Sequence, residues 1–197
     1  MKKWIRILFL LALWLLNSDS RGVATESMAC YPKPNGYYRL AIPDTAYTYT
    51  SLIGYPYAFC LSDNAYIVER NQPNGQYWID IQYPTLNATI HCSYKPVEKN
   101  LHVLLRDAQE FLFSHSTVAS AIPVREFANP DSRVWGLYYE LYGNTATPIQ
   151  FILTDSTQHF FRGSVYWNSI PNQDSLAPIA DYLRKDARKI MESMEWY

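Results

Sequence analysis

The most regular pattern of apolar and polar positions lies between residues 149 and 168. Apolar side chains alternate with polar ones on both sides of the polar segment 155–158. The alternating apolar positions are Ile149, Phe151 and Leu153 before that segment and Phe161, Val165 and Trp167 after it. A two-residue period on both sides of a polar turn predicts a β-hairpin.

Two longer stretches have helical spacing instead. Apolar residues recur every three or four positions from Glu98 to His115 and again from Leu176 to Met194. This spacing predicts two amphipathic helices, each with one apolar side to pack against a sheet. Asp174 or Ser175 is the predicted N-cap of the second helix, because both side chains can accept a hydrogen bond from a free backbone N–H.

The remaining chain favours strands. The sequence holds 17 Tyr, 8 Phe and 6 Trp, residues that suit half-buried pleated surfaces. Short strand-like runs occupy residues 55–59, 65–69, 77–81, 88–94, 120–127 and 133–141. They predict an antiparallel meander in the first half and an α+β fold, in which a twisted antiparallel β-sheet packs with two main α-helices. Residues 37–197 form the predicted single domain.

The N-terminal region has the layout of an export signal. Lys2, Lys3 and Arg6 precede the apolar run 7–16, and polar residues follow at once. The run is short for a membrane span, so residues 1–29 are predicted to be a signal peptide, with a retained membrane anchor as the alternative. Prolines stiffen residues 30–36, which are predicted to form a tether.

Cys30 is the candidate lipidation site, because the small Ala29 precedes it as in a bacterial lipoprotein. Ser27 stands where a leucine-like residue is usual, and the apolar run ends well before Cys30. Ordinary cleavage after Ala24 or Ala29 is the alternative.

The three cysteines cannot all pair with one another. If Cys30 carries lipid, Cys60 and Cys92 remain as an even pair in an oxidising compartment. Neighbouring strands would bring them within bridging distance, which makes them a candidate disulfide. The alternative is two buried thiols that act as small hydrophobic groups.

Charge and motifs exclude several functions. The 17 basic and 18 acidic residues leave a net charge of −1, so no nucleic-acid partner is predicted. The sequence has no nucleophile elbow, phosphate loop, dinucleotide fingerprint or histidine pair at metal-ligand spacing, and no cofactor or metal is predicted. His159 near Asp155 and Thr157 suggests a catalytic triad, but a polar turn that binds its own backbone is the favoured interpretation.

Two further features concern the hairpin. Arg162 either holds a carboxylate of a partner or bridges to a neighbouring strand, and the structural role is favoured. Gly163 allows a bulge or a close approach of other groups to the backbone. Adjacent aromatic pairs such as Tyr166 and Trp167 place one ring on each side of a strand, so one ring of each pair remains for a helix, solvent or a partner.

Several segments together resemble the gliding motility lipoprotein GldD family. They are Pro32–Tyr37, Ala88–Pro96, Gln150–Gly163 and Asn172–Pro178. The resemblance implies a cell-envelope lipoprotein that is required for surface movement, faces the periplasm and is held to the membrane by a lipid anchor. It also implies other gliding motility and secretion-machinery proteins as partners, and it brings no catalytic residue. The residues of the family motif in the hairpin and helix cap are Thr154, Asp155, Ser156, His159, Arg162, Gly163, Asp174 and Ser175.

The leading hypothesis is therefore a non-enzymatic component that binds proteins of the motility machinery and the linked surface-protein secretion machinery. The alternative is a periplasmic module that binds envelope polysaccharide or another small ligand through aromatic side chains, with Trp78, Trp135 and Trp167 as candidates. An enzyme is the third hypothesis. It would require His159 and Asp155 to converge with another polar group in a cleft.

Overall fold

The computed structural model describes residues 42–72, 75–114 and 118–197, and the side chains of residues 71–76 are not described. The described residues belong to one compact unit that spans residues 37–197. The predicted signal peptide, the tether and Cys30 lie outside the described residues. No helix among those residues is long and apolar enough to cross a membrane.

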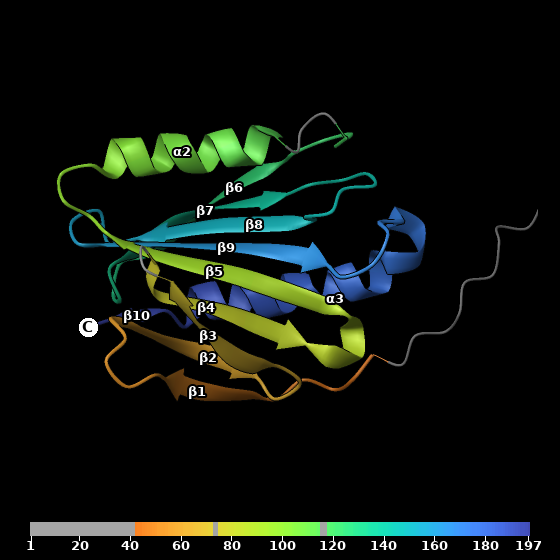
Figure 1. Ribbon diagram of the computed structural model, residues 1–197, viewed down its shortest axis with the longest axis horizontal. Helices are drawn as coiled ribbons and strands as arrows, with labels where there is room; N and C mark the ends of the chain where they lie inside the picture. The colour runs from red at the N-terminus through yellow and green to blue at the C-terminus, as the bar shows by residue number, and fades with distance from the viewer. Residues whose placement is uncertain (1–41, 73–74, 115–117) are drawn as a thin grey trace, which may run out of the picture. The chain divides into compact units, whose positions relative to one another are not determined.

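A seven-stranded antiparallel sheet forms the centre of the domain (Figure 1). Its strands are β3 (Tyr66–Gln72), β4 (Gly75–Tyr83), β5 (Ala88–Pro96), β6 (Val124–Asn129), β7 (Val134–Glu140), β8 (Ile149–Thr154) and β9 (His159–Trp167). Their order across the sheet is β3-β4-β5-β9-β8-β7-β6. The predicted hairpin is confirmed as β8 and β9, and β9 also pairs with β5, so the hairpin lies in the middle of the sheet.

A second sheet joins distant parts of the chain. It contains β1 (Tyr47–Ser51), β2 (Tyr57–Ser62) and β10 (Glu195–Trp196) in the order β1-β2-β10. The strand predicted at residues 55–59 is therefore part of this sheet and not of the meander, which consists of β3, β4 and β5. β1 and β10 had no prediction, because β1 is polar and largely exposed and β10 has two residues.

The two helices lie on opposite faces of the seven-stranded sheet, as Figure 1 shows. We call the face that carries α2 (Leu101–Ser114) the outer face, and the face that carries α3 (Gln173–Glu192) the inner face. α2 begins later than predicted because Lys99 adopts a left-handed backbone conformation with a φ of 61°. The carbonyl of Asn100 then accepts the first helical hydrogen bonds from Val103 and Leu104. A 3-10 turn, η1 (Pro84–Leu86), links β4 to β5.

The inner face holds the main hydrophobic core. Side chains of β4, β5, β8 and β9 meet α3 and β2 there, and the largest fully buried ones are aromatic or branched. Phe161 shows the density of this packing, because its ring lies 4.8 Å from Tyr57 and 6.3 Å from Phe151, measured between ring centroids. The predicted α+β fold is confirmed.

The outer face holds a smaller core. α2 contributes Leu104, Ala108 and Leu112, and these pack against Tyr139, Leu141, Ile152 and Phe160. These sheet residues belong to β7, β8 and β9 or directly follow β7, so the helix covers one part of the sheet. The outward side chains of β3, β4 and β5 are not part of that core.

Candidate functional site

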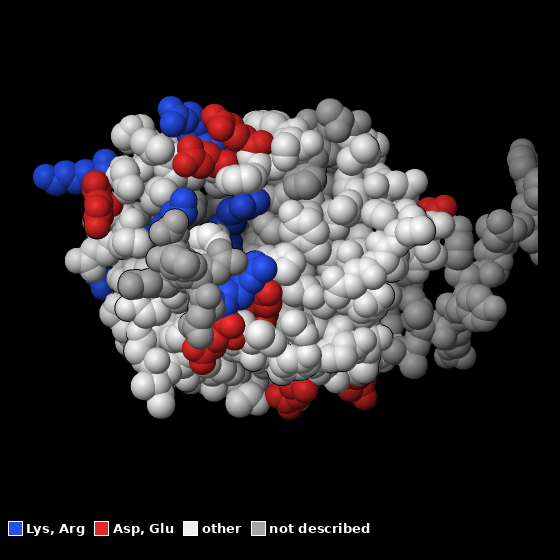
Figure 2. Space-filling view, in the orientation of Figure 1, with Lys and Arg blue, Asp and Glu red and all other residues white. Residues whose placement is uncertain are grey.

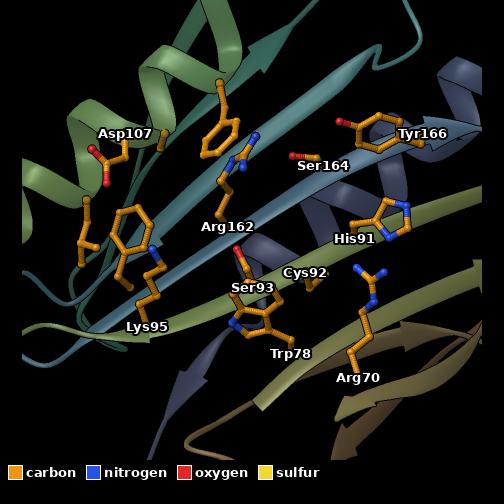
Figure 3. A pocket seen from close by; sticks show the side chains of 14 residues that line it. Arg70, Trp78, His91, Cys92, Ser93, Lys95, Asp107, Arg162, Ser164 and Tyr166 are labelled. Atoms are coloured by element: carbon orange, nitrogen blue, oxygen red, sulfur yellow. The ribbon is translucent and has the colours of Figure 1, made fainter. Parts of the chain in front are cut away.

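A pocket of about 430 Å³ lies where α2 leaves the sheet uncovered. We call it the outer-face pocket. It is lined by Arg70, Trp78, His91, Cys92, Ser93, Lys95, Leu104, Asp107, Ala108, Phe111, Phe160, Arg162, Ser164 and Tyr166. Figure 2 shows Lys and Arg side chains gathered below α2 on this face, and Figure 3 shows how the labelled side chains of the strands and of α2 surround the pocket.

Strand pairing explains how these polar side chains meet. Ser93 lies opposite Arg162, and His91 lies opposite Ser164, in the register of β5 and β9. Because successive residues of a strand point to opposite faces, these positions share the outer face while Phe161 and Val165 enter the core. The central hairpin thus supplies both the core and part of the pocket.

Arg162 has unusual partners for a partly buried cation. Its Nη2 donates a hydrogen bond of 2.9 Å to the Gln150 side-chain oxygen, and its guanidinium lies 5.1 Å from the centre of the Phe111 ring. Burial lowers the pKa of the Arg162 guanidinium. The hydrogen bond to Gln150 is the predicted bridge to a neighbouring strand. Among the described residues, no carboxylate lies within 4 Å of the Arg162 guanidinium, so no ion pair neutralises its charge.

Gly163 is required by close packing. A Cβ atom at this position would lie 2.2 Å from the ring of Phe151, far inside a normal contact distance. The predicted close approach is therefore made by a buried aromatic side chain of the neighbouring strand β8. This contact fixes the strand segment on which Arg162 and Ser164 stand.

At the edge near β3, a carboxylate links two other lining residues. Asp80 accepts from Arg70 at 3.2 Å and lies 2.7 Å from Nδ1 of His91. Arg70 is thus neutralised by its neighbour, unlike Arg162. The His91 ring also contacts Tyr166, with 5.2 Å between ring centroids.

Ser164 lies in the pocket with an unused polar atom. The residue is 4 % exposed, and its Oγ has no hydrogen-bond partner among the described residues. Figure 3 shows the hydroxyl oxygen on the side that faces Arg162. A buried hydroxyl without a partner is unfavourable, which distinguishes this position from an ordinary structural serine.

The Thr154–Ser156 turn and His159 do not form a catalytic arrangement. Asp155 Oδ1 accepts from the backbone N–H groups of Thr157, Gln158 and His159, and Oδ2 accepts from the Thr157 hydroxyl. Burial acts to raise the pKa of Asp155, but these hydrogen bonds outweigh it and lower the pKa to about 2. Thr154 Oγ1 donates to the carbonyl of His159 and accepts from the N–H of Ser156, so the turn binds its own backbone as favoured from sequence.

His159 is held by aromatic neighbours. Its Nδ1 lies 2.9 Å from the hydroxyl of Tyr94, and its ring stacks on Trp196 with 5.1 Å between centroids. Burial lowers the pKa of His159. No hydrogen bond joins its ring to the Asp155 carboxylate within the described part of the chain.

The predicted N-cap of the last helix is wrong by two residues or more. Asn172 is the N-cap, and its side-chain oxygen accepts from the N–H of Ser175. Ser175 donates back to the carbonyl of Asn172, while Asp174 lies in the first turn of α3. None of these residues lines the outer-face pocket.

The candidate disulfide is not formed in the structure. Cys60 and Cys92 are free cysteines, and they stand in β2 and β5, which belong to different sheets. The expectation of neighbouring strands was wrong because β2 pairs with β1 and β10. Burial raises the pKa of the Cys92 thiol, so the alternative of a buried, neutral thiol describes this residue.

Each of the three tryptophans proposed from sequence lines a hollow. Trp78 lines the outer-face pocket, and Trp135 lines a second hollow of about 370 Å³ between α2 and β6–β8. Trp167 lines a smaller one of about 160 Å³ beside the start of α3. The hollows are separate, so the tryptophans do not form one stacking surface.

The sequence interpretation singled out Trp78, Arg162 and Tyr166 but missed most of the other residues that line the pocket. Arg70, His91, Lys95, Phe111 and Ser164 were not proposed. One signal was present, because His91 and Ser93 alternate with apolar residues in the strand predicted at residues 88–94, and Lys95 continues the alternation directly after it. Their position beside Arg162 depends on the pairing of β5 with β9, which local patterns do not give.

The described residues hold no group of three or more histidine, cysteine or acidic side chains able to bind a metal ion. The fold and the site define an α+β domain that has a helix on each face of its sheet and a cationic, aromatic-lined pocket. Residues 27–196 match the family of the gliding motility lipoprotein GldD, and the chain belongs to this family. The family is one of motility lipoproteins and is not a known enzyme family.

Other comparisons add little. A search of curated proteins finds no match. The solution structure of cyanobacterial PsbP (CyanoP) from Synechocystis sp. PCC 6803 is similar with a TM-score of 0.47 and 8% sequence identity. The alignment covers 79% of this chain and 95% of that chain. The TM-score and the sequence identity are both too low to support a statement about function.

Proposed function

We propose that this gliding motility lipoprotein is a non-enzymatic, periplasm-facing component that binds proteins of the motility machinery and the linked surface-protein secretion machinery. The observation that supports it is the outer-face pocket, where Arg162 and Lys95 stand among aromatic side chains. Arginine and aromatic side chains are enriched at the centres of protein interfaces. The pocket lies on a part of the sheet that α2 leaves uncovered.

The proposal includes a lipid on Cys30 as the membrane anchor, after removal of residues 1–29. Mass spectrometry of the mature N-terminus tests this directly. A diacylglyceryl group on Cys30 is the expected result. A mature chain that begins after Ala24, one that begins at Cys30 without lipid, or a chain that keeps its leader would contradict the lipid anchor without affecting the proposed binding role.

Cross-linking in living cells tests the binding role. Phe111 is 59% exposed and lines the pocket, so a photo-crosslinking phenylalanine analogue at this position should capture a motility or secretion protein. The same analogue at Ile53, fully exposed in the turn between β1 and β2, is the matched control. If Phe111 captures no motility or secretion protein while the chain remains functional, the proposed role is wrong.

A ligand-binding module for envelope polysaccharide remains the second candidate. The hollows at Trp78, Trp135 and Trp167 favour it, because a sugar ring can stack on an exposed indole. Binding of purified envelope polysaccharide that is lost in Trp78→Ala would support this candidate. If the polysaccharide binds at none of the three hollows, this candidate is excluded.

A further inference from the structure

The outer-face pocket carries one positive charge more than its own residues neutralise. Its cationic side chains are Arg70, Lys95 and Arg162, and its carboxylates are Asp107 in the lining and Asp80, which binds Arg70. With histidine counted as neutral, the excess is one positive charge. It stays at one when the neighbours of Asp107 are included, because Arg106 lies 3.8 Å from Asp107 and 3.9 Å from Glu110. Lys95 and Arg162 have no carboxylate within 4 Å among the described residues.

The excess charge lies beside a buried hydrogen-bond donor. Ser164 stands two residues after Arg162 on the same side of β9. The residue is 4 % exposed, and its Oγ has no hydrogen-bond partner among the described residues. Arg162 uses Nη2 for Gln150, which leaves other N–H groups of its guanidinium available. A guanidinium and a hydroxyl side by side match the two oxygens of a carboxylate.

The rest of the lining is largely apolar. Phe111 lies over the Arg162 guanidinium, and Trp78 donates its indole N–H to the carbonyl of Tyr94, so the indole has no donor left for a ligand. Leu104 and Phe160 add apolar surface from α2 and β9. A volume of about 430 Å³ is within the range of small-ligand pockets and is sufficient for a carboxylate with an adjoining apolar side chain.

We propose that the outer-face pocket binds a carboxylate of a partner polypeptide, either an acidic side chain or the chain end, next to an apolar residue of that polypeptide. Arg162 and Ser164 hold the carboxylate, Lys95 attracts it at the rim, and Trp78 and Phe111 pack against the apolar residue. This inference rests on the protein-binding role proposed above. It adds which groups of the partner the pocket binds, a carboxylate and an adjoining apolar side chain.

Charge and polarity both favour this ligand. One excess positive charge is balanced by one carboxylate, whereas a phosphate group carries up to two negative charges. An acidic sugar would bring hydroxyl groups around its ring, and each buried hydroxyl requires a partner. Apart from its cations, the polar lining consists of Asp107, two serines, Tyr166 and His91, whose Nδ1 already lies 2.7 Å from Asp80, against several apolar side chains.

The test measures binding of short peptides to the full mature protein in detergent, by isothermal titration calorimetry and saturation-transfer NMR. One probe is acetyl-Gly-Phe-Glu amide, and its matched control carries Gln in place of Glu. The second is acetyl-Gly-Gly-Phe with a free carboxylate, and its control is the amide. The pair that binds identifies the source of the carboxylate, and both controls should bind at least about tenfold more weakly.

Variants assign the interaction to the pocket. Arg162→Gln should weaken binding about tenfold or more, and Ser164→Ala about three- to tenfold. Arg162→Lys keeps the charge but loses the planar fork, so it should recover part of the affinity. Lys95 is exposed at the rim, so Lys95→Gln should fold and should reduce both the affinity for the acidic peptide and the dependence of that affinity on salt. This variant keeps the test possible if Arg162→Gln fails to fold. Arg125→Gln removes a charge near Glu140 and α3 and should have no effect.

Three results would overturn the inference. The first is equal binding of the acidic peptides and their neutral controls. The second is a loss of affinity in Arg125→Gln that equals the loss in Lys95→Gln. The third is binding of glucuronic acid when neither acidic peptide binds. The cross-linking experiment separates the two proposals. Capture of a motility protein from Phe111 without carboxylate dependence would leave the proposed function standing and remove only this inference.

Discussion

The inner face of the seven-stranded sheet meets α3 and the three-stranded sheet, whereas α2 covers only the part of the outer face formed by β7, β8 and β9. The same strand β9 serves both faces, with Phe161 at 0% exposure on one side and Arg162 in a pocket on the other. The inner face therefore accounts for most of the hydrophobic stabilisation. The uncovered part of the outer face is where polar residues remain accessible to a ligand.

The largest effect is expected from the inner face. Phe161→Ala removes a ring that packs between Tyr57, Phe59 and Phe151, and it should lower the free energy of unfolding by about 3–5 kcal/mol. Urea denaturation followed by tryptophan fluorescence measures this change. Phe111→Ala on the outer face is the matched control and should cost less than about 1 kcal/mol, because Phe111 is exposed. Equal losses would refute the contrast between the faces.

The next effect concerns the packing between the two strands of the hairpin. Gly163→Ala places a Cβ atom against the Phe151 ring and should lower the free energy of unfolding by about 2–3 kcal/mol. The double variant Gly163→Ala with Phe151→Leu should recover part of the loss if the ring is the obstacle. The same denaturation experiment shows it, and a stability unchanged from wild type would mean that the close approach is absent.

A smaller effect is expected at the turn between β8 and β9. Asp155→Asn should cost about 1–2 kcal/mol at neutral pH, because the charged acceptor of three backbone N–H groups is lost. Folding lowers the pKa of Asp155 to about 2, so its contribution is present above the pKa of an unfolded aspartate, about 3.9. It is lost as the pH falls from about 4 towards 2.

Denaturation curves at several pH values test this dependence. The difference in stability between wild type and Asp155→Asn should shrink as the pH falls below 4 and should reach its minimum only below pH 2, where the carboxyl group is protonated in both states. A difference that is the same at all pH values would show that the ionised carboxylate is not the stabilising group.

The smallest effect is expected in the pocket itself. Ser164→Ala removes a buried hydroxyl that has no partner, so stability should change by less than about 1 kcal/mol and can increase. A thermal melt of the variant beside wild type measures it. A large loss of stability would mean that Ser164 has a structural role, and the contrast between the faces would no longer hold at this position.

Local patterns predicted most of the fold. The hairpin of β8 and β9, both helices and the main strands follow from two-residue and three- to four-residue periods. Pairing between distant segments was not predictable in this way. β2 was assigned to the meander, and β10 is too short to show a period, because a strand of two residues is stabilised by its partners and not by its own sequence.

The site was harder to predict than the fold. Arg162 and Gly163 were found through their place in the predicted hairpin and are also part of the family motif, and the turn around Asp155 was found through its composition. Ser164 gave no signal, and the alternation that includes Lys95 was a weak one, since a serine or lysine in a strand is common on solvated faces. Their importance depends on the part of the sheet that α2 leaves open, which is a property of tertiary structure.

The three-stranded sheet also bears on how the chain folds. Tyr49 in β1 donates to Glu195 in β10, residues 146 positions apart, and Trp196 closes over His159. These contacts have high sequence separation, so loop-closure entropy must be overcome late in folding. The three-stranded sheet is therefore complete only when Glu195 and Trp196 pair with β2, so its formation depends on a segment that lies more than 130 residues further along the chain.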